Sequence, residues 1–331
     1  MDRLIKLIIT FFASIPPIKK YKLQKINKCL ETVDLKKILA LNHEIVMKEY
    51  IRELTNCNYC VYLEAHNNFR KKMEENFDAE SLHNFYYNSE WVKASKIKFG
   101  ILRSNTGTYN QYTNKIRFRK DSLNHEFFHM CSTNYDSTYV SSGFSIDLHE
   151  KSIGNGINEG YTDLLTARYF DEDISDSYFI ESKFAANLEK IIGRETMEKL
   201  YMKGDFIGFI KSLTQFYTID EIEQFLLEFD VVSLYIDEYL SKEGENKLNL
   251  LIENCICFLI KGYSKVLVNS GLSNELKKER MEMYFYDMKV FHSVYSDEYK
   301  FNMDRINQII EQNLGKDAII DVEEVELDKI R

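Results

Sequence analysis

The sequence predicts an α+β protein in which helices predominate and a small antiparallel or mixed sheet accompanies them. Only two prolines and 13 glycines occur among the 331 residues, so little interrupts long helices. Apolar residues recur at helical spacing through most of the chain. A short stretch near residues 95–119 alternates between apolar and polar residues instead, which is typical of strands.

Three regions follow one another along the chain. Residues 1–92 are predicted to form a helical N-terminal region, whose His66 and His83 fall on polar segments and are expected to be exposed. Residues 93–173 are predicted to form the core, in which KIKFGILR and TYNQYTNKIRFRK indicate short strands and two helices follow. Residues 174–331 contain repeated amphipathic segments and predict a helical C-terminal domain that forms the other wall of a cleft.

Composition and charge argue against several classes of function. A net charge of −9 disfavours nucleic acid as a partner, because binding phosphates requires a basic surface. No apolar run approaches the length of about 20 residues that crosses a bilayer, so no integral membrane segment is expected. The N-terminal sequence MDRLIKLIITFFASIPP has Asp2 before its apolar run and lacks a small-residue cleavage site. We therefore expect a cytoplasmic protein, with secretion as the alternative.

The segment LNHEFFHM contains a pattern that predicts a zinc site. His125 and His129 are four residues apart, so on a helix both imidazoles lie on one face and can bind one ion. Glu126 is turned by about 100° around the helix axis. It can therefore act as a general base beside the metal rather than as a ligand. The pattern also arises by chance, and catalysis requires a third ligand and an open fourth position.

A second segment, GNGINEGYTD, offers the third ligand. Glu159 lies 30 residues after His129, and its carboxylate can complete a site with two histidines. Asp163 follows four residues later on the same helical face. It can accept a hydrogen bond from the ring nitrogen of a ligand histidine that does not bind the metal. Gly154 and Gly156 allow a tightly packed entry to this helix.

The two motifs together carry a resemblance to a known family. HEFFH at residues 125–129 and NEGYTD at residues 158–163 resemble the motifs of the gluzincin zinc metallopeptidases, the thermolysin-like and aminopeptidase-like group. In that group the first motif supplies two zinc ligands and the catalytic glutamate, and a following helix supplies the third ligand. The match covers about residues 95–170 and implies a gluzincin-like core, in which a short sheet accompanies the active-site helices.

The resemblance implies a role for each matched residue. The implied zinc ligands are His125, His129 and Glu159. Glu126 is implied to be the general base, which makes the chain a metalloprotease and a hydrolase with Zn²⁺ as its cofactor. Asp163 and Asn158 are implied to orient the ligand histidines from behind.

The resemblance also implies a peptide or protein substrate. The aminopeptidase branch carries a Gly-Ala-Met-Glu-Asn loop before its HExxH motif, and this chain lacks that loop, so an endopeptidase is expected. The segment IRFRK is the expected edge strand that pairs with an extended substrate. Thermolysin-like enzymes stabilise the oxyanion of the tetrahedral intermediate with a tyrosine and a histidine. The candidates for that role here are Tyr161, Tyr139 and His292.

A second interpretation belongs to another class of protein. The helical segments could form a regulatory or interaction protein, in which the zinc site is structural or the peptidase domain is vestigial. The intact Glu126 argues against a decayed enzyme, and structural zinc sites are usually closed by four protein ligands. A zinc hydrolase acting on a non-peptide amide shares the same chemistry. No sequence feature indicates the oligomeric state.

Overall fold

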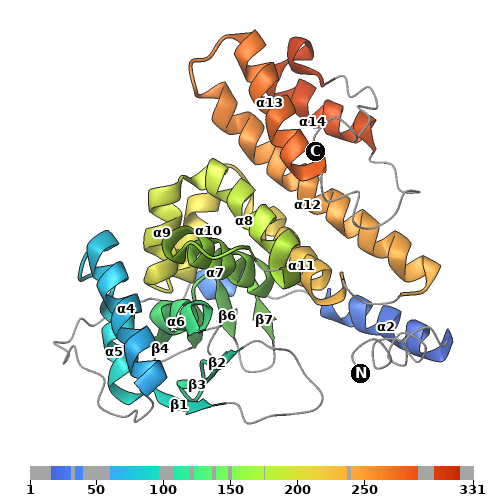
Figure 1. Cartoon of the computed structure of the whole chain (residues 1–331). Coiled ribbons are helices and arrows are strands. Elements are labelled where there is room, and N and C mark those ends of the chain that lie inside the picture. Colours follow the sequence, from blue (N-terminus) through green and yellow to red (C-terminus); the bar gives the residue numbers. More distant parts are fainter. Residues whose placement is uncertain are drawn as a thin grey trace. The chain divides into compact units, whose positions relative to one another are not determined.

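A computed structural model of the chain divides into two compact units, residues 1–248 and residues 249–331 (Figure 1). The stretches that the structure describes are residues 16–30, 34–39, 60–96, 107–118, 123–135, 139–147, 151–174, 176–236, 240–289 and 302–320.

The first unit is built mainly of helices around two small sheets. Before the first sheet come α2 (Pro16–Cys29), α3 (Leu35–Leu39), α4 (Cys60–Asn76) and α5 (His83–Trp91). Between and after the strands come α6 (Leu123–Ser132), α7 (Asn155–Phe170), η1 (Asp176–Tyr178) and α8 (Phe179–Ile192). The unit continues with α9 (Arg194–Met202), α10 (Phe206–Leu213) and α11 (Ile219–Tyr235). The helix-rich α+β prediction is thereby confirmed.

The first sheet is mixed, with the order β1-β3-β2. Its strands are β1 (Lys93–Lys96), β2 (Thr108–Asn110) and β3 (Lys115–Phe118). β3 pairs in parallel with β1 and antiparallel with β2, so it is the central strand. The prediction that IRFRK forms an edge strand is therefore wrong. The two edges of this sheet are β1 and β2, and β3 lies between them. The error arose because the pairing of β1 with β3 joins segments about 20 residues apart, which local periodicity does not report.

The second sheet is antiparallel throughout, with the order β4-β5-β6-β7. Its strands are β4 (Thr133–Tyr135), β5 (Val140–Ser142), β6 (Ser145–Asp147) and β7 (Ser152–Ile153). β4 follows directly on α6, and α7 begins two residues after β7. This sheet therefore connects the two helices that carry the HEFFH and NEGYTD motifs.

Close packing fixes α7 within the first unit. A Cβ atom added to Gly160 would lie 2.1 Å from the backbone carbonyl of Glu181, so α7 and α8 approach too closely for any larger residue. A Cβ atom on Gly156 would lie 2.9 Å from the ring of Phe229 in α11. Both glycines thus bring the helix of the NEGYTD motif against its neighbours.

The predicted domain limits differ from the observed division. A boundary was expected at residues 173/174, but α8 packs along α7, and α8 to α11 belong to the same compact unit as the sheets. The limit expected at residues 92/93 also falls inside this unit. The observed division, at residues 248/249, falls inside α12 (Lys242–Val268). Hydrophobic periodicity predicted helices here without indicating which of them share a core.

The second unit contains most of α12, α13 (Asn274–Lys289), α14 (Met303–Leu314) and η3 (Lys316–Ala318). Tyr263 of α12 stacks on Tyr284 of α13 with ring centroids 4.0 Å apart. Arg305 of α14 pairs with Glu253 of α12 at 3.2 Å. Among the described residues of the whole chain, no helix is both long and apolar enough to cross a membrane.

His66 of α4 is buried, contrary to the expectation from its polar sequence neighbours. Only 2% of the residue is exposed, and its Nε2 lies 2.9 Å from the hydroxyl of Ser89. Phe85 stacks on its imidazole ring. Burial, with a smaller contribution from the charge of Arg70, lowers the pKa of His66 to about 4. His66 is therefore a neutral residue of the core.

This burial predicts a loss of stability in acid. Between pH 6.5 and about 4 the unfolded chain binds a proton at His66 that the folded chain does not, so stability falls as the pH falls. We expect up to about 3 kcal/mol of unfolding free energy to be lost from this group. Urea unfolding of wild type and of His66→Gln at several pH values measures it. Identical pH dependence in both proteins would contradict the assignment.

Candidate metal centre

The helix α6 is anchored by aromatic residues on the side opposite its histidines. Phe127 and Phe128 are fully buried, and their rings lie 5.3 and 5.0 Å from the ring of Phe69 in α4. Phe127 also contacts Tyr62 edge-on at 5.3 Å. Because this face of α6 is fixed in the core, its remaining face presents the histidines of the HEFFH motif to a pocket.

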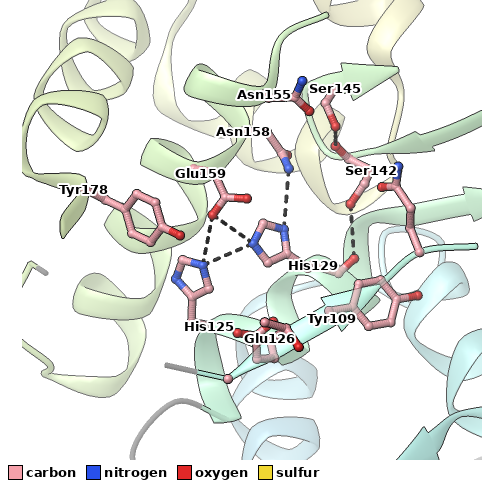
Figure 2. A pocket seen from close by; sticks show the side chains of 13 residues that line it. Tyr109, His125, Glu126, His129, Ser142, Ser145, Asn155, Asn158, Glu159 and Tyr178 are labelled. Carbon is pink, nitrogen blue, oxygen red and sulfur yellow. Dashed lines mark hydrogen bonds and ion pairs between the residues drawn. The ribbon is translucent and has the colours of Figure 1, made fainter. Parts of the chain in front are cut away.

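Three potential metal ligands meet between α6 and α7 (Figure 2). The Nε2 atoms of His125 and His129 are 3.1 Å apart. The Oε2 atom of Glu159 lies 3.3 Å from each of them. Within the part of the chain that the structure describes, no other group of His, Cys, Asp and Glu side chains is arranged to hold an ion. Sequence spacing had predicted all three residues.

The size of this triangle suits a zinc ion. Zinc binds imidazole nitrogen and carboxylate oxygen at about 2.0–2.2 Å, so its tetrahedral ligand atoms are about 3.3–3.4 Å apart. The observed separations of 3.1–3.3 Å are close to that value. Two nitrogens and one oxygen are also a donor set that zinc accepts. The residues present therefore fit the predicted ion.

The second ring nitrogens of both histidines face side chains of α7. The Nδ1 atom of His125 lies 3.8 Å from Oδ1 of Asp163, which is a charge contact rather than a hydrogen bond. Ser182 of α8 donates a hydrogen bond to the other oxygen of Asp163 at 3.1 Å. The Nδ1 atom of His129 lies 3.4 Å from the amide of Asn158. The structure thus brings both predicted orienting residues behind the ligands.

Asn158 also joins α7 to the second sheet. Its Oδ1 atom accepts a hydrogen bond from the backbone N–H of Phe144 at 3.1 Å, while its Nδ2 atom faces His129. A histidine that binds a metal through Nε2 carries its proton on Nδ1 and needs an acceptor there. In the observed orientation Asn158 presents its Nδ2 donor to this ring nitrogen, and its Oδ1 acceptor is directed to Phe144 instead.

Glu126 lies beside the ligands rather than among them, as Figure 2 shows. Its carboxylate is buried, and the backbone N–H of Tyr109 in β2 lies near enough to lower its pKa slightly. Burial raises the pKa of Glu126 to about 7, the charge of His125 opposes that rise, and the charge of Glu159 adds to it. A carboxyl group with a pKa near neutrality can both accept and return a proton.

Glu159 is held in its charged form by its neighbours. Partial burial raises its pKa, but the charges of His129 and His125 and their hydrogen bonds outweigh this and lower the pKa well below the usual range. The position suits a carboxylate ligand, because metal binding also requires the deprotonated group.

Sequence reasoning missed Tyr178 of η1. Its ring stacks almost parallel on the imidazole of His125, with centroids 5.4 Å apart and an angle of 9°. Its hydroxyl lies near the carboxylate of Glu159. The charge of Glu159, together with burial, raises the pKa of Tyr178 far above its usual value, so the hydroxyl keeps its proton. The only sequence signal was its place in a polar loop just after the NEGYTD helix.

The structure does not bring the predicted oxyanion donors to the ligands. Tyr161 points to the opposite side of α7, where its hydroxyl donates to Glu189 at 2.9 Å beside Arg168. Tyr139 is buried and does not line the pocket. Tyr161 was favoured for its nearness in sequence to Glu159, but two residues along a helix turn a side chain by about 200°. His292 lies outside the described residues.

The ligands face a cavity of about 180 Å³. Its walls come from β2 and the turns beside it, from β5 and β6, from α6 and α7, and from η1. Besides Glu126 and the three ligands, the lining residues are Gly107, Thr108, Tyr109, Gln111, Ser142, Ser145, Asn155, Asn158 and Tyr178. Among these described residues there is no lysine or arginine, and the only acidic groups are Glu126 and Glu159.

None of the protein-family models, curated proteins or solved structures that were compared with the chain matches it. The resemblance to gluzincins therefore stays a prediction from the two sequence motifs.

Removal of Asp163 should weaken metal binding without removing a ligand. We expect Asp163→Ala to raise the zinc dissociation constant by about 10–100-fold, because the ring of His125 loses the group that orients it. Thr166→Ala is the matched control, since Thr166 is also a buried polar residue of α7 but contacts the backbone of Thr162 instead. Competition with a chromophoric chelator measures both constants. Equal constants for the two variants would contradict the assigned role.

Proposed function

We propose that this protein is a zinc-dependent metallopeptidase that hydrolyses peptide bonds and acts as an endopeptidase. One observation carries the proposal. The Nε2 atoms of His125 and His129 and the Oε2 atom of Glu159 form a triangle with edges of 3.1–3.3 Å at a polar pocket, next to the buried carboxylate of Glu126.

The same geometry favours a catalytic site over a structural one. Structural zinc is usually enclosed by four protein ligands, often cysteines. Among the described residues only three ligands converge, and all three line the cavity. A catalytic zinc ion needs an open position of this kind, where it supplies a water of lowered pKa and polarises the substrate carbonyl.

Glu126 is the residue proposed to move the proton. Its carboxylate takes a proton from the attacking water and later returns it to the leaving amine nitrogen. The backbone N–H of Tyr109 in β2 lies near this carboxylate. Glu126 follows the proposed ligand His125 on α6, so it has the position beside the metal that a general base requires.

Tyr178 is the residue proposed to stabilise the oxyanion. Its hydroxyl keeps its proton and lies beside Glu159 at the pocket, so it can donate a hydrogen bond to an oxygen that becomes negative there. The stacking of its ring on His125 fixes the direction of the hydroxyl. It replaces Tyr161, Tyr139 and His292 as the proposed donor.

The lining of the pocket supports an endopeptidase. An enzyme that binds the free amino terminus of a substrate would need a carboxylate besides Glu126 and Glu159, which already have proposed roles. An enzyme that binds the free carboxyl terminus of a substrate would need a cationic side chain. The described lining residues offer neither. β2 is an edge strand along the same pocket, and an extended peptide can pair with such an edge. The proposed substrate is therefore an internal segment of a peptide or protein.

The Glu126→Gln variant should retain its metal and lose its activity. Glutamine preserves the size of the side chain but cannot accept the proton, so we expect turnover to fall by a factor of about 10² or more while the zinc content stays unchanged. Digestion of a broad peptide library followed by mass spectrometry measures activity. Glu75→Gln, an exposed residue of α4, is the control. Undiminished cleavage by metal-loaded Glu126→Gln would refute the proposed base.

The Tyr178→Phe variant should lose catalytic rate without losing affinity for the substrate. Phenylalanine keeps the ring that stacks on His125 but removes the hydroxyl. We expect kcat to fall by about 10²-fold, a loss typical for one oxyanion donor, with KM and zinc content close to wild type. Steady-state kinetics on a peptide identified in the library digest measures both constants. A rise in KM alone would show that Tyr178 binds substrate instead.

A further inference from the structure

The helix that presents Glu159 lacks a cap of its own. The N-cap residue of α7 is Gly154, which has no side chain to accept a hydrogen bond, and the first turn of the helix contains no acidic residue. The first N–H groups of a helix need acceptors, and its N-terminus carries a partial positive charge. Both requirements must be met from elsewhere in the chain.

The carboxyl group of Asp230 in α11 supplies the missing acceptors, and burial raises the pKa of this group to about 7. Its Oδ2 atom accepts a hydrogen bond from the N–H of Gly154 at 2.8 Å, and its Oδ1 atom accepts one from Gly156 at 2.8 Å. The N–H of Asn155 also contacts this carboxylate. One side chain, 74 and 76 residues away along the sequence, therefore accepts hydrogen bonds from two backbone donors at the start of α7.

The same turn is confined on two sides. Gly154 has φ +89°, which favours glycine, and a Cβ atom there would lie 2.1 Å from the carbonyl oxygen of Phe144 in the β5–β6 turn. On the other side Gly156 packs against Phe229, the residue before Asp230. The start of α7 thus has a fixed location between the second sheet and α11.

We propose that Asp230 is a positioning residue for the metal centre, because it fixes the helix turn that presents Asn158 and Glu159. This inference rests on the proposed metal site. Glu159 lies about one turn beyond the clamped N–H groups, so a displacement of the turn moves its carboxylate directly. Ligand distances in metal sites lie within about 0.2 Å of their standard values, so a displaced Glu159 carboxylate would bind the ion less tightly.

A helix cap that only stabilises the fold would affect stability when removed, whereas a cap that positions a metal ligand would also affect metal affinity. Asp205 provides the comparison, since its side chain accepts a hydrogen bond from the N–H of Gly208 at 2.7 Å and caps α10. None of the proposed metal ligands lies on α10. Asp205→Ala therefore removes the same kind of interaction by the same substitution at a site that should not affect the metal.

The experiment compares the full-length wild type, Asp230→Ala, Asp230→Asn and Asp205→Ala. Urea unfolding measures stability, and titration with Co²⁺ measures affinity and records the visible absorption of the bound ion. We expect both alanine variants to be less stable. Asp230→Ala should bind Co²⁺ at least about tenfold more weakly and with an altered absorption spectrum, while Asp205→Ala binds as wild type does. Hydrogen exchange of amides 154–159 should accelerate in Asp230→Ala alone.

Asp230→Asn keeps the size of the side chain and one acceptor oxygen, so it provides the measurement if the alanine variant does not fold. Its Co²⁺ affinity should lie between those of wild type and of Asp230→Ala. Equal affinities in wild type and in the Asp230 variants would overturn the positioning role and leave the proposed function intact. A wild type that binds no Co²⁺ would overturn both, and the two failures are thereby distinguished.

Discussion

Two imidazoles and a carboxylate converge at the pocket within hydrogen-bonding distance of one another, and the rest of the site depends on this convergence. The three ligand atoms lie within 3.1–3.3 Å of one another, and a second carboxylate, Glu126, is buried beside them. Such an arrangement costs free energy unless protons or a cation compensate the charge. The surrounding structure must therefore fix the position of α6 relative to α7.

The packing around α6 and α7 supplies that constraint. Phe127 and Phe128 fix one face of α6 in an aromatic core, and Gly160 allows α8 to approach the back of α7. Behind the ligands, Ser182 of α8 hydrogen-bonds to Asp163, which in turn faces His125. The stability of the fold and the geometry of the site are thus coupled, because the same helix contacts serve both.

The sequence predicted those site residues whose arrangement follows from their spacing along one helix. Helical spacing indicated His125 and His129 as ligands and Glu126 as the base, and the motif after two glycines indicated Glu159 and Asp163. What it could not predict depends on contacts between distant segments. The placement of Tyr178 depends on how the chain leaves α7, and Asp230 caps a helix more than 70 residues away. The central position of β3 follows from its parallel pairing with β1, which periodicity does not report.

The most direct test of the account is the coordination of zinc in the purified, zinc-loaded wild type, measured by X-ray absorption together with metal content. We expect about one zinc per chain, with two imidazole nitrogens and additional oxygen ligands at about 2.0–2.2 Å. Absence of stoichiometric zinc would contradict it. So would sulfur ligands at about 2.3 Å, because they would identify a structural cysteine site elsewhere in the chain.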